Sequence, residues 1–202
     1  MADKTTAIVD FLFEVGILSQ TPRSWPHFLG SGKQSVAEHL NRATYIGYVL
    51  ASMEGDVDMA KVLQMCLFHD LAEGRTSDLN YVHQKYTSVD EQKAIDELAD
   101  PLPFGENIRT ILHEYEERES KESIVAKDAD NLEFILSLKE QTDIGNTRSK
   151  TWLPSAVARI KTKSGKKLAK KILETDSDHW WFADKDSEWW ITRNGKDAHG
   201  KK

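Results

Sequence analysis

Apolar side chains recur along most of this chain at intervals of three and four residues, the spacing of helices that bury one face. Near the start, Ile8, Phe11, Leu12 and Val15 follow this spacing. The same pattern predicts further helices over residues 35–53, 56–73, 88–100, 107–118 and from 120 to about 140. Residues 21–33, rich in Pro, Gly and Ser, predict an extended loop. We therefore expect an all-α fold.

Two serine and glutamate pairs mark helix starts. Ser35 with Glu38, and Ser88 with Glu91, have the spacing of a capping box, in which each side chain satisfies a free amide of the first turn. The helix predicted over residues 56–73 is apolar on nearly every side in its second half. We expect it to be the central, buried helix of the fold.

The chain changes character after Gln141. Residues 141–150 are polar and predict a linker, and a lysine-rich helix with Lys166, Lys167, Lys170 and Lys171 follows. Two tryptophan pairs, 180–181 and 189–190, flank a turn-like stretch and make a candidate β-hairpin. We expect a helical core over residues 1–140 and a small extension over residues 141–202.

Composition narrows the class of protein. The 202 residues are 39% hydrophobic and 30% charged, with a formal net charge of -6, which argues against general nucleic-acid binding. The longest apolar run is too short for a membrane span, and the start does not resemble a secretory signal. The single cysteine, Cys66, allows no internal disulfide, so we expect a cytoplasmic protein.

The candidate chemistry lies at the end of the apolar helix, at His69 and Asp70. A carboxylate is tolerated inside a protein when it is paired or coordinates a metal. His39 and Asp130 can reach the same point from two other helices. Two imidazoles with two carboxylates suit one divalent ion such as Mn, Fe, Co, Ni or Zn better than Ca or Mg. A histidine oriented by its neighbour, without a metal, is the alternative.

The order of these motifs resembles the HD-domain superfamily. The motifs are Ser35-Val36-Ala37-Glu38-His39, His69-Asp70-Leu71-Ala72-Glu73 with Asp78, and Lys127-Asp128-Ala129-Asp130. The chain is most similar to the 5′-deoxynucleotidases of that superfamily, from about Ile8 to Leu138 and including Pro22-Arg23-Ser24-Trp25 and Glu114-Tyr115-Glu116. We see no likeness beyond Gln141. The resemblance implies an HD-domain helical bundle in which His39, His69, Asp70 and Asp130 hold the metal.

The resemblance also assigns catalytic carboxylates. It makes Glu73 the acid or base and Asp78 a second active-site carboxylate. On a continuous helix His69 and Glu73, four residues apart, would share a face, so Glu73 could address a metal-bound water. A solvated helix end for Glu73 and an ordinary turn aspartate for Asp78 are the alternatives. Asp128 competes with Asp130, but residues two apart point in different directions on a helix.

Substrate contacts are implied as well. Arg23 and Trp25 resemble positions that contact phosphate and select deoxyribose in relatives, although Ser24 separates them here. Arg42, one turn after His39, is a fainter phosphate candidate. Alternatively, Arg23 is an ordinary surface cation, Trp25 anchors the loop, and Arg42 is a solvated helix residue.

The function implied is that of a metal-dependent phosphohydrolase, which converts (deoxy)ribonucleoside 5′-monophosphates to nucleoside and phosphate. Hydrolysis of a nucleoside triphosphate or another phosphate ester is one alternative, and a non-catalytic nucleotide or metal sensor is another. The resemblance implies a homodimer with a nucleotide substrate and without nucleic-acid or membrane partners.

Overall fold

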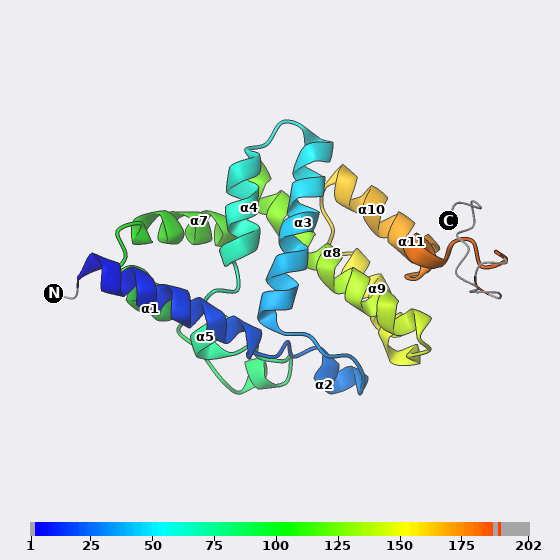
Figure 1. Ribbon diagram of the computed structural model, residues 1–202, viewed down its shortest axis with the longest axis horizontal. Coiled ribbons are helices and arrows are strands. Elements are labelled where there is room, and N and C mark those ends of the chain that lie inside the picture. The colour runs from blue at the N-terminus through cyan, green and yellow to red at the C-terminus, as the bar shows by residue number, and fades with distance from the viewer. Residues whose placement is uncertain (1–2, 188–189, 191–202) are drawn as a thin grey trace, which may run out of the picture.

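The computed structural model describes residues 3–187 and 190, and over these residues the chain is helical without a strand. Figure 1 shows the helices gathered around α3, α4 and α8. The elements are α1 (Lys4–Gly16), η1 (Ile17–Ser19), α2 (Pro26–Leu29), α3 (Val36–Glu54), α4 (Met59–Phe68), α5 (Glu73–Thr76), η2 (His83–Lys85), α6 (Glu91–Ala99), α7 (Gly105–Glu117), α8 (Lys121–Asp143), α9 (Thr147–Val157), α10 (Lys163–Glu174) and α11 (His179–Phe182). The all-α prediction is confirmed.

Helix α8 is the centre of the fold. It contacts α3, α4, α7, α9 and α10, and its buried stripe includes Val125, Ala129, Leu132, Ile135 and Leu138. The sequence pattern had assigned this central place to residues 56–73, which was wrong. Helix α4 ends at Phe68, and its Leu67 is half exposed, because one side of α4 packs on α3 and α8 while the other meets solvent.

Local signals place several helix ends. Ser35 and Glu38 form the predicted capping box at the start of α3, and Ser120 caps α8 by accepting from the amide of Ser123. The second predicted box is wrong, because Asp90 caps α6 by accepting from the amide of Lys93. Both aspartate and serine suit an N-cap, so the side chain nearer the first turn takes the role.

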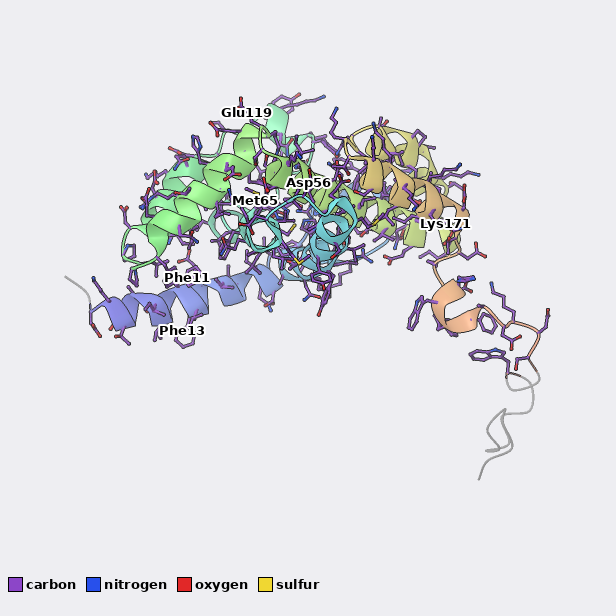
Figure 2. All side chains as sticks on the ribbon, turned by 90° about the horizontal axis from the view of Figure 1, so that it is seen from above. Phe11, Phe13, Asp56, Met65, Glu119 and Lys171 are labelled. Atoms are coloured by element: carbon purple, nitrogen blue, oxygen red, sulfur yellow. The ribbon has the colours of Figure 1, made fainter. Side chains whose placement is uncertain are left out.

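The core has two parts. One cluster joins α3, α4 and α8 with α9 and α10, through residues such as Leu50, Met65 and Leu153. The other joins η1, α3, α6 and α7, through residues such as Leu18, Leu40 and Ile108. Figure 2 places Met65 between the surrounding helices. No helix within residues 3–187 is long and apolar enough to cross a bilayer.

The segment after Gln141 departs from its prediction. Helix α8 runs to Asp143 and α9 begins at Thr147, so the predicted linker is only a short turn. Leu153 and Ala156 of α9 and Ala169 of α10 share a core cluster with α8. The division at residue 140 stays a prediction, whereas the packing joins α9 and α10 to the helical core.

The predicted β-hairpin is wrong in its first arm. Trp180 and Trp181 lie in the short helix α11, and Trp189 falls outside the described residues. Trp190 packs against Trp181 and Phe182, with ring centroids 5.9 and 4.6 Å apart. Trp181 and Trp190, one from each pair, therefore meet through a ring contact.

Candidate metal centre and substrate cleft

Three segments bring the candidate ligands together. His39 lies in the second turn of α3, whose start the capping box fixes, and Asp130 lies in the middle of α8. His69 and Asp70 lie in a turn after α4. The amide of Glu73 donates to the carbonyl of Asp70 at 3.0 Å, so the chain tightens there and α5 starts anew. The expected continuous helix through His69 and Glu73 was therefore wrong.

The donor atoms have the separations of a metal's first shell. Nε2 of His39 lies 3.1 Å from Nε2 of His69 and 3.4 Å from a carboxylate oxygen of both Asp70 and Asp130. Nε2 of His69 lies 3.6 and 3.8 Å from the same two carboxylates. Ligands about 2.1 Å from one ion are about 3.0 Å apart at right angles and about 3.4 Å apart in a tetrahedron. The donor atoms of His39, His69 and Asp70 therefore fit one metal ion, and Asp130 approaches the two histidines without being part of this compact group.

The outer ring nitrogens fix both imidazoles. Nδ1 of His39 lies 2.7 Å from Oε2 of Glu133, which is 1% exposed, and Nδ1 of His69 lies 3.1 Å from the carbonyl oxygen of Cys66. With Nδ1 donating, Nε2 keeps its lone pair and faces the common point. Partners of this kind orient metal-ligating histidines and raise their basicity.

The charges around the donor atoms favour a bound cation. Burial alone would lower the pKa of His39, but hydrogen bonds to Asp130 and Glu133 raise it to about 9. Burial would raise the pKa of Asp130, but Lys127 and the two histidines hold it well below its usual range. The field that retains a proton on His39 also attracts a metal dication, and the two compete for Nε2.

Arg23 lies beside the donor cluster. Its Nη1 is 2.7 Å from Asp70 and 3.7 Å from Glu73, and its Nε is 3.3 Å from Asp78. Burial opposes its charge, yet these carboxylates raise the pKa of Arg23 above its ordinary value. Asp78 also accepts from the amide and hydroxyl of Ser24 at 2.9 and 2.8 Å. The inserted Ser24 therefore ties the Arg23 loop to Asp78.

Glu73 has a carboxylate oxygen, Oε2, that is buried and makes no hydrogen bond. Burial raises the pKa of Glu73, and the nearby carboxylate of Asp70 raises it further. A buried polar atom without a partner is uncommon and calls for an explanation such as a catalytic role or a missing ligand. Glu73 is therefore placed beside the donor cluster with one oxygen free to exchange a proton.

These groups line one cleft of about 920 Å³. Its lining includes Arg23, Trp25, Asp70, Glu73, Asp78 and Asp130. Trp25 is held through its indole N–H, which donates to Gln34 at 3.1 Å. Arg42 does not reach this cleft. It donates to Glu133 and Glu140 behind His39 and lines a second hollow of about 390 Å³, which it shares with Trp25 but not with Arg23.

A family model described as HD domain matches residues 15–173. This chain belongs to the HD-domain family. The HD-domain match continues past Gln141, where sequence analysis saw no likeness, and so includes α9 and nearly all of α10. The resemblance stated from the sequence motifs is confirmed.

Curated relatives share part of the chain. The 5′-deoxynucleotidase HDDC2 of Dictyostelium discoideum is 31% identical over 119 residues, which are 53% of this chain and 62% of that protein. The Danio rerio protein of the same name is 26% identical over 143 residues, 68% of this chain and 70% of that protein. The chain thus spans less than two thirds of the length of the Dictyostelium relative.

Solved structures share the HD-domain fold. The PH0347 protein from Pyrococcus horikoshii OT3 has 27% identity and a TM-score of 0.66, covering 82% of this chain and 96% of that one. A predicted metal-dependent phosphohydrolase from Magnetospirillum magnetotacticum MS-1 has 22% identity and a TM-score of 0.67, covering 85% of this chain and 91% of that one. The second of these likenesses shows the fold alone.

Sequence analysis of this HD domain missed Glu133. The signal was present, because Glu133 is a carboxylate inside the apolar stripe of α8, one turn after Asp130. Asp128 is also buried, but it accepts from the amides of Lys161 and Thr162 and so anchors the start of α10. Asp128 and Asp130 therefore point in different directions from α8, as their spacing of two residues on a helix predicts.

Proposed function

We propose that this HD domain is a metal-dependent phosphohydrolase that converts nucleoside 5′-monophosphates, deoxyribonucleotides included, to nucleoside and phosphate. The observation that carries the proposal is the donor cluster of His39, His69 and Asp70. Its Asp70 lines a cleft that Arg23 and Glu73 also line. The curated relatives named 5′-deoxynucleotidases support the substrate class.

The proposed ligands are His39, His69, Asp70 and Asp130, and the proposed ion is one divalent Mn, Co, Fe, Ni or Zn. Imidazole and carboxylate donors together suit these ions. When bound, such an ion polarises a phosphoryl oxygen and lowers the pKa of water. Glu133 and the carbonyl of Cys66 keep both imidazoles turned toward it.

The residues of the chain supply binding and proton transfer. The planar guanidinium of Arg23 matches phosphate oxygens, and its carboxylate partners keep it charged. The free Oε2 of Glu73 accepts a proton from the attacking water as the new P–O bond forms. It then returns a proton to the 5′ oxygen when the old P–O bond breaks. Asp78 holds the Arg23 loop in place.

Trp25 forms a wall of the cleft next to this loop. A buried indole fixed by a hydrogen bond cannot turn away to admit an added hydroxyl group. We therefore propose that Trp25 limits the space at the sugar and favours deoxyribose. Ser24, which separates Trp25 from Arg23, reduces that preference relative to proteins in which the two are adjacent.

The test is metal analysis of the purified protein beside a phosphate-release screen over ribo- and deoxyribonucleoside monophosphates. Glu73→Gln should keep the metal and lose turnover by about 10²- to 10⁴-fold, because it removes proton transfer but leaves the ligands. Glu106→Gln, on the exposed start of α7, is the matched control and should be unaffected. Unchanged activity in Glu73→Gln would remove Glu73 from the mechanism.

A second candidate substrate is a nucleoside triphosphate. Arg118, Lys127, Arg159 and Lys161 also line the cleft and could attract additional phosphates. The products separate the candidates, since a monophosphatase releases phosphate and a triphosphohydrolase releases tripolyphosphate. A metal-loaded protein inert toward every nucleotide would favour a sensor.

We also propose a homodimer that works in the cytoplasm, where the free thiol of Cys66 is stable. The outward face of α1 carries Leu12 and Phe13, which are 63% and 78% exposed. Figure 2 shows Phe13 pointing away from the body of the protein, opposite to Phe11. Exposed apolar side chains grouped on one helix face are typical of a subunit contact.

A further inference from the structure

The lining of the cleft includes aromatic side chains as well as the carboxylates. Phe28 of α2, Tyr81 of the segment after α5, and Phe134 of α8 all line the cleft and are together called the aromatic wall. These three residues come from distant parts of the chain, and none of them takes part in the proposed metal binding or proton transfer. A phosphate bound near Arg23 would fill only part of a cleft of about 920 Å³.

Trp152 of α9 supports this wall from behind. Its ring centroid lies 6.4 Å from those of Phe28, Tyr81 and Phe134, in tilted or edge contacts. Trp152 does not line the cleft itself. Ring pairs at this spacing and angle are favourable and hold each other's orientation. Trp152 therefore gathers three separate segments into one surface.

A cationic side chain lies at the exposed edge of the wall. Nη2 of Arg159, in the turn after α9, donates to the hydroxyl of Tyr81 at 3.3 Å. Arg159 and Tyr81 both line the cleft, and both remain open to solvent. The cleft thus combines aromatic rings and a second guanidinium with the carboxylates and Arg23.

We propose that this aromatic wall, formed by Phe28, Tyr81 and Phe134 and supported by Trp152, is the nucleobase subsite. The inference rests on the proposed function, which places the phosphate at Arg23 in the same cleft. A nucleobase is flat and apolar on its faces and polar at its edge, so it suits stacking rings beside a guanidinium. Because every base has such a face, the wall distinguishes nucleotides from baseless phosphates and tolerates different bases.

The subsite gives α9 and the turn after it a role in specificity. Trp152 and Arg159 both follow Gln141, beyond the motifs that supply the metal ligands. Helix α9 packs along α8, which carries both Asp130 and Phe134. The same long helix therefore fixes the separation of Asp130 and Phe134.

The first experiment measures binding of thymidine, which lacks a phosphate, to the full metal-loaded chain by titration calorimetry. Tyr81→Ala should weaken binding about tenfold, the loss typical of one stacking ring. Tyr81→Phe keeps the ring and should bind nearly as the unchanged protein does. Tyr86→Ala removes a more exposed tyrosine that does not line the cleft, so it is the matched control. Equal thymidine binding in Tyr81→Ala and Tyr86→Ala would overturn the proposal.

The second experiment compares thymidine 5′-monophosphate with deoxyribose 5-phosphate, which has no base. Tyr81→Ala and Trp152→Leu should lower kcat/KM about tenfold for the nucleotide and leave it unchanged for the sugar phosphate. An equal loss for both substrates would overturn the proposal. If the unchanged protein releases no phosphate from either, the proposed function fails, while thymidine binding still tests the wall by itself.

The role of Arg159 is tested with a triphosphate. If Arg159 faces the base edge, Arg159→Met should weaken the binding of thymidine and of thymidine 5′-triphosphate by the same factor. A loss confined to the triphosphate would place a further phosphate at Arg159 and overturn its assignment to the base.

Discussion

Glu133 lies 2.7 Å from Nδ1 of His39, and its other oxygen accepts two hydrogen bonds from Arg42 at 2.9 and 2.7 Å. Gln34 donates to that second oxygen at 2.6 Å. Burial opposes the charge of Glu133, but His39 and Arg42 lower its pKa to about 2. Glu133 is thus a charged carboxylate with both oxygens hydrogen-bonded, and it contacts the candidate metal ligand His39 on the side away from the other donors.

Glu133→Ala should reduce metal affinity by about 10- to 100-fold, because His39 loses the partner that orients it. Titration with a competing chelator measures this affinity directly. Glu140→Ala is the control, since Glu140 also binds Arg42 but is half exposed and does not contact His39. Equal affinity in the two variants would show that His39 is oriented by other contacts.

The raised pKa of His39 makes the stability of the metal-free protein fall as the pH rises. This pKa rises from about 6.5 in the unfolded chain to about 9 in the folded one. A histidine with a raised pKa stabilises the fold fully when the pH is below its pKa in the unfolded chain. This stabilisation is lost as the pH rises through its pKa in the folded protein. The titration of His39 should therefore lower the stability of the chelated protein by up to about 3 kcal/mol between pH 6 and pH 9, and the raised pKa of Glu73 adds a loss of the same sign.

Urea unfolding of the chelated protein at both pH values measures that loss. His39→Asn should make the dependence shallower by the His39 share, and the share of Glu73, whose pKa is also raised to about 9, should remain. Metal binding should show the opposite trend and strengthen as pH rises, since a metal needs the deprotonated imidazole. A metal-free protein more stable at pH 9 than at pH 6 would contradict the assignment to His39.

Much of the fold follows from local signals in the sequence. The Ser35 and Glu38 capping box starts α3 as predicted, and apolar spacing gives the course of α8. The break after Phe68 was not predictable, because apolar spacing continues through it and only a tight turn separates α4 from α5. Tryptophan has high strand propensity, but Trp181 and Phe182 lie on the short helix α11, and both contact Trp190.

The site was predictable in its residue types more than in its connections. The motifs nominate His39, His69, Asp70 and Asp130, and the structure brings their donor atoms together. Their roles as ligands stay a prediction. The partner of Arg42 could not be read from spacing, because Glu133 is 91 positions away and meets it only when α3 packs on α8.

Gly47 permits the close packing of α3 on α4. A Cβ atom at this position would lie 2.6 Å from Sγ of Cys66 and 3.4 Å from a methyl carbon of Val62. Gly47→Ala should therefore destabilise the fold by about 1–3 kcal/mol, as overpacked core substitutions do. Denaturant unfolding measures the change.

Cys66→Ala supplies the matching half of a double-mutant cycle. With the sulfur removed, Gly47→Ala has room, so the double variant should be more stable than the sum of the single effects predicts. Strictly additive effects would mean that Gly47 and Cys66 do not restrict each other.

The outward face of α1 makes the proposed dimer testable. The inner residues Ile8, Phe11 and Val15 pack on the core, whereas Phe13 points outward and is 78% exposed. Phe13→Glu should convert the dimer to a monomer, because a charge in an apolar contact loses its hydration without gaining a partner. Light scattering after gel filtration gives the mass. Tyr86→Glu, at a residue 85% exposed elsewhere on the surface, should remain a dimer. If Phe13→Glu keeps the dimer mass, the subunit contact lies on another face.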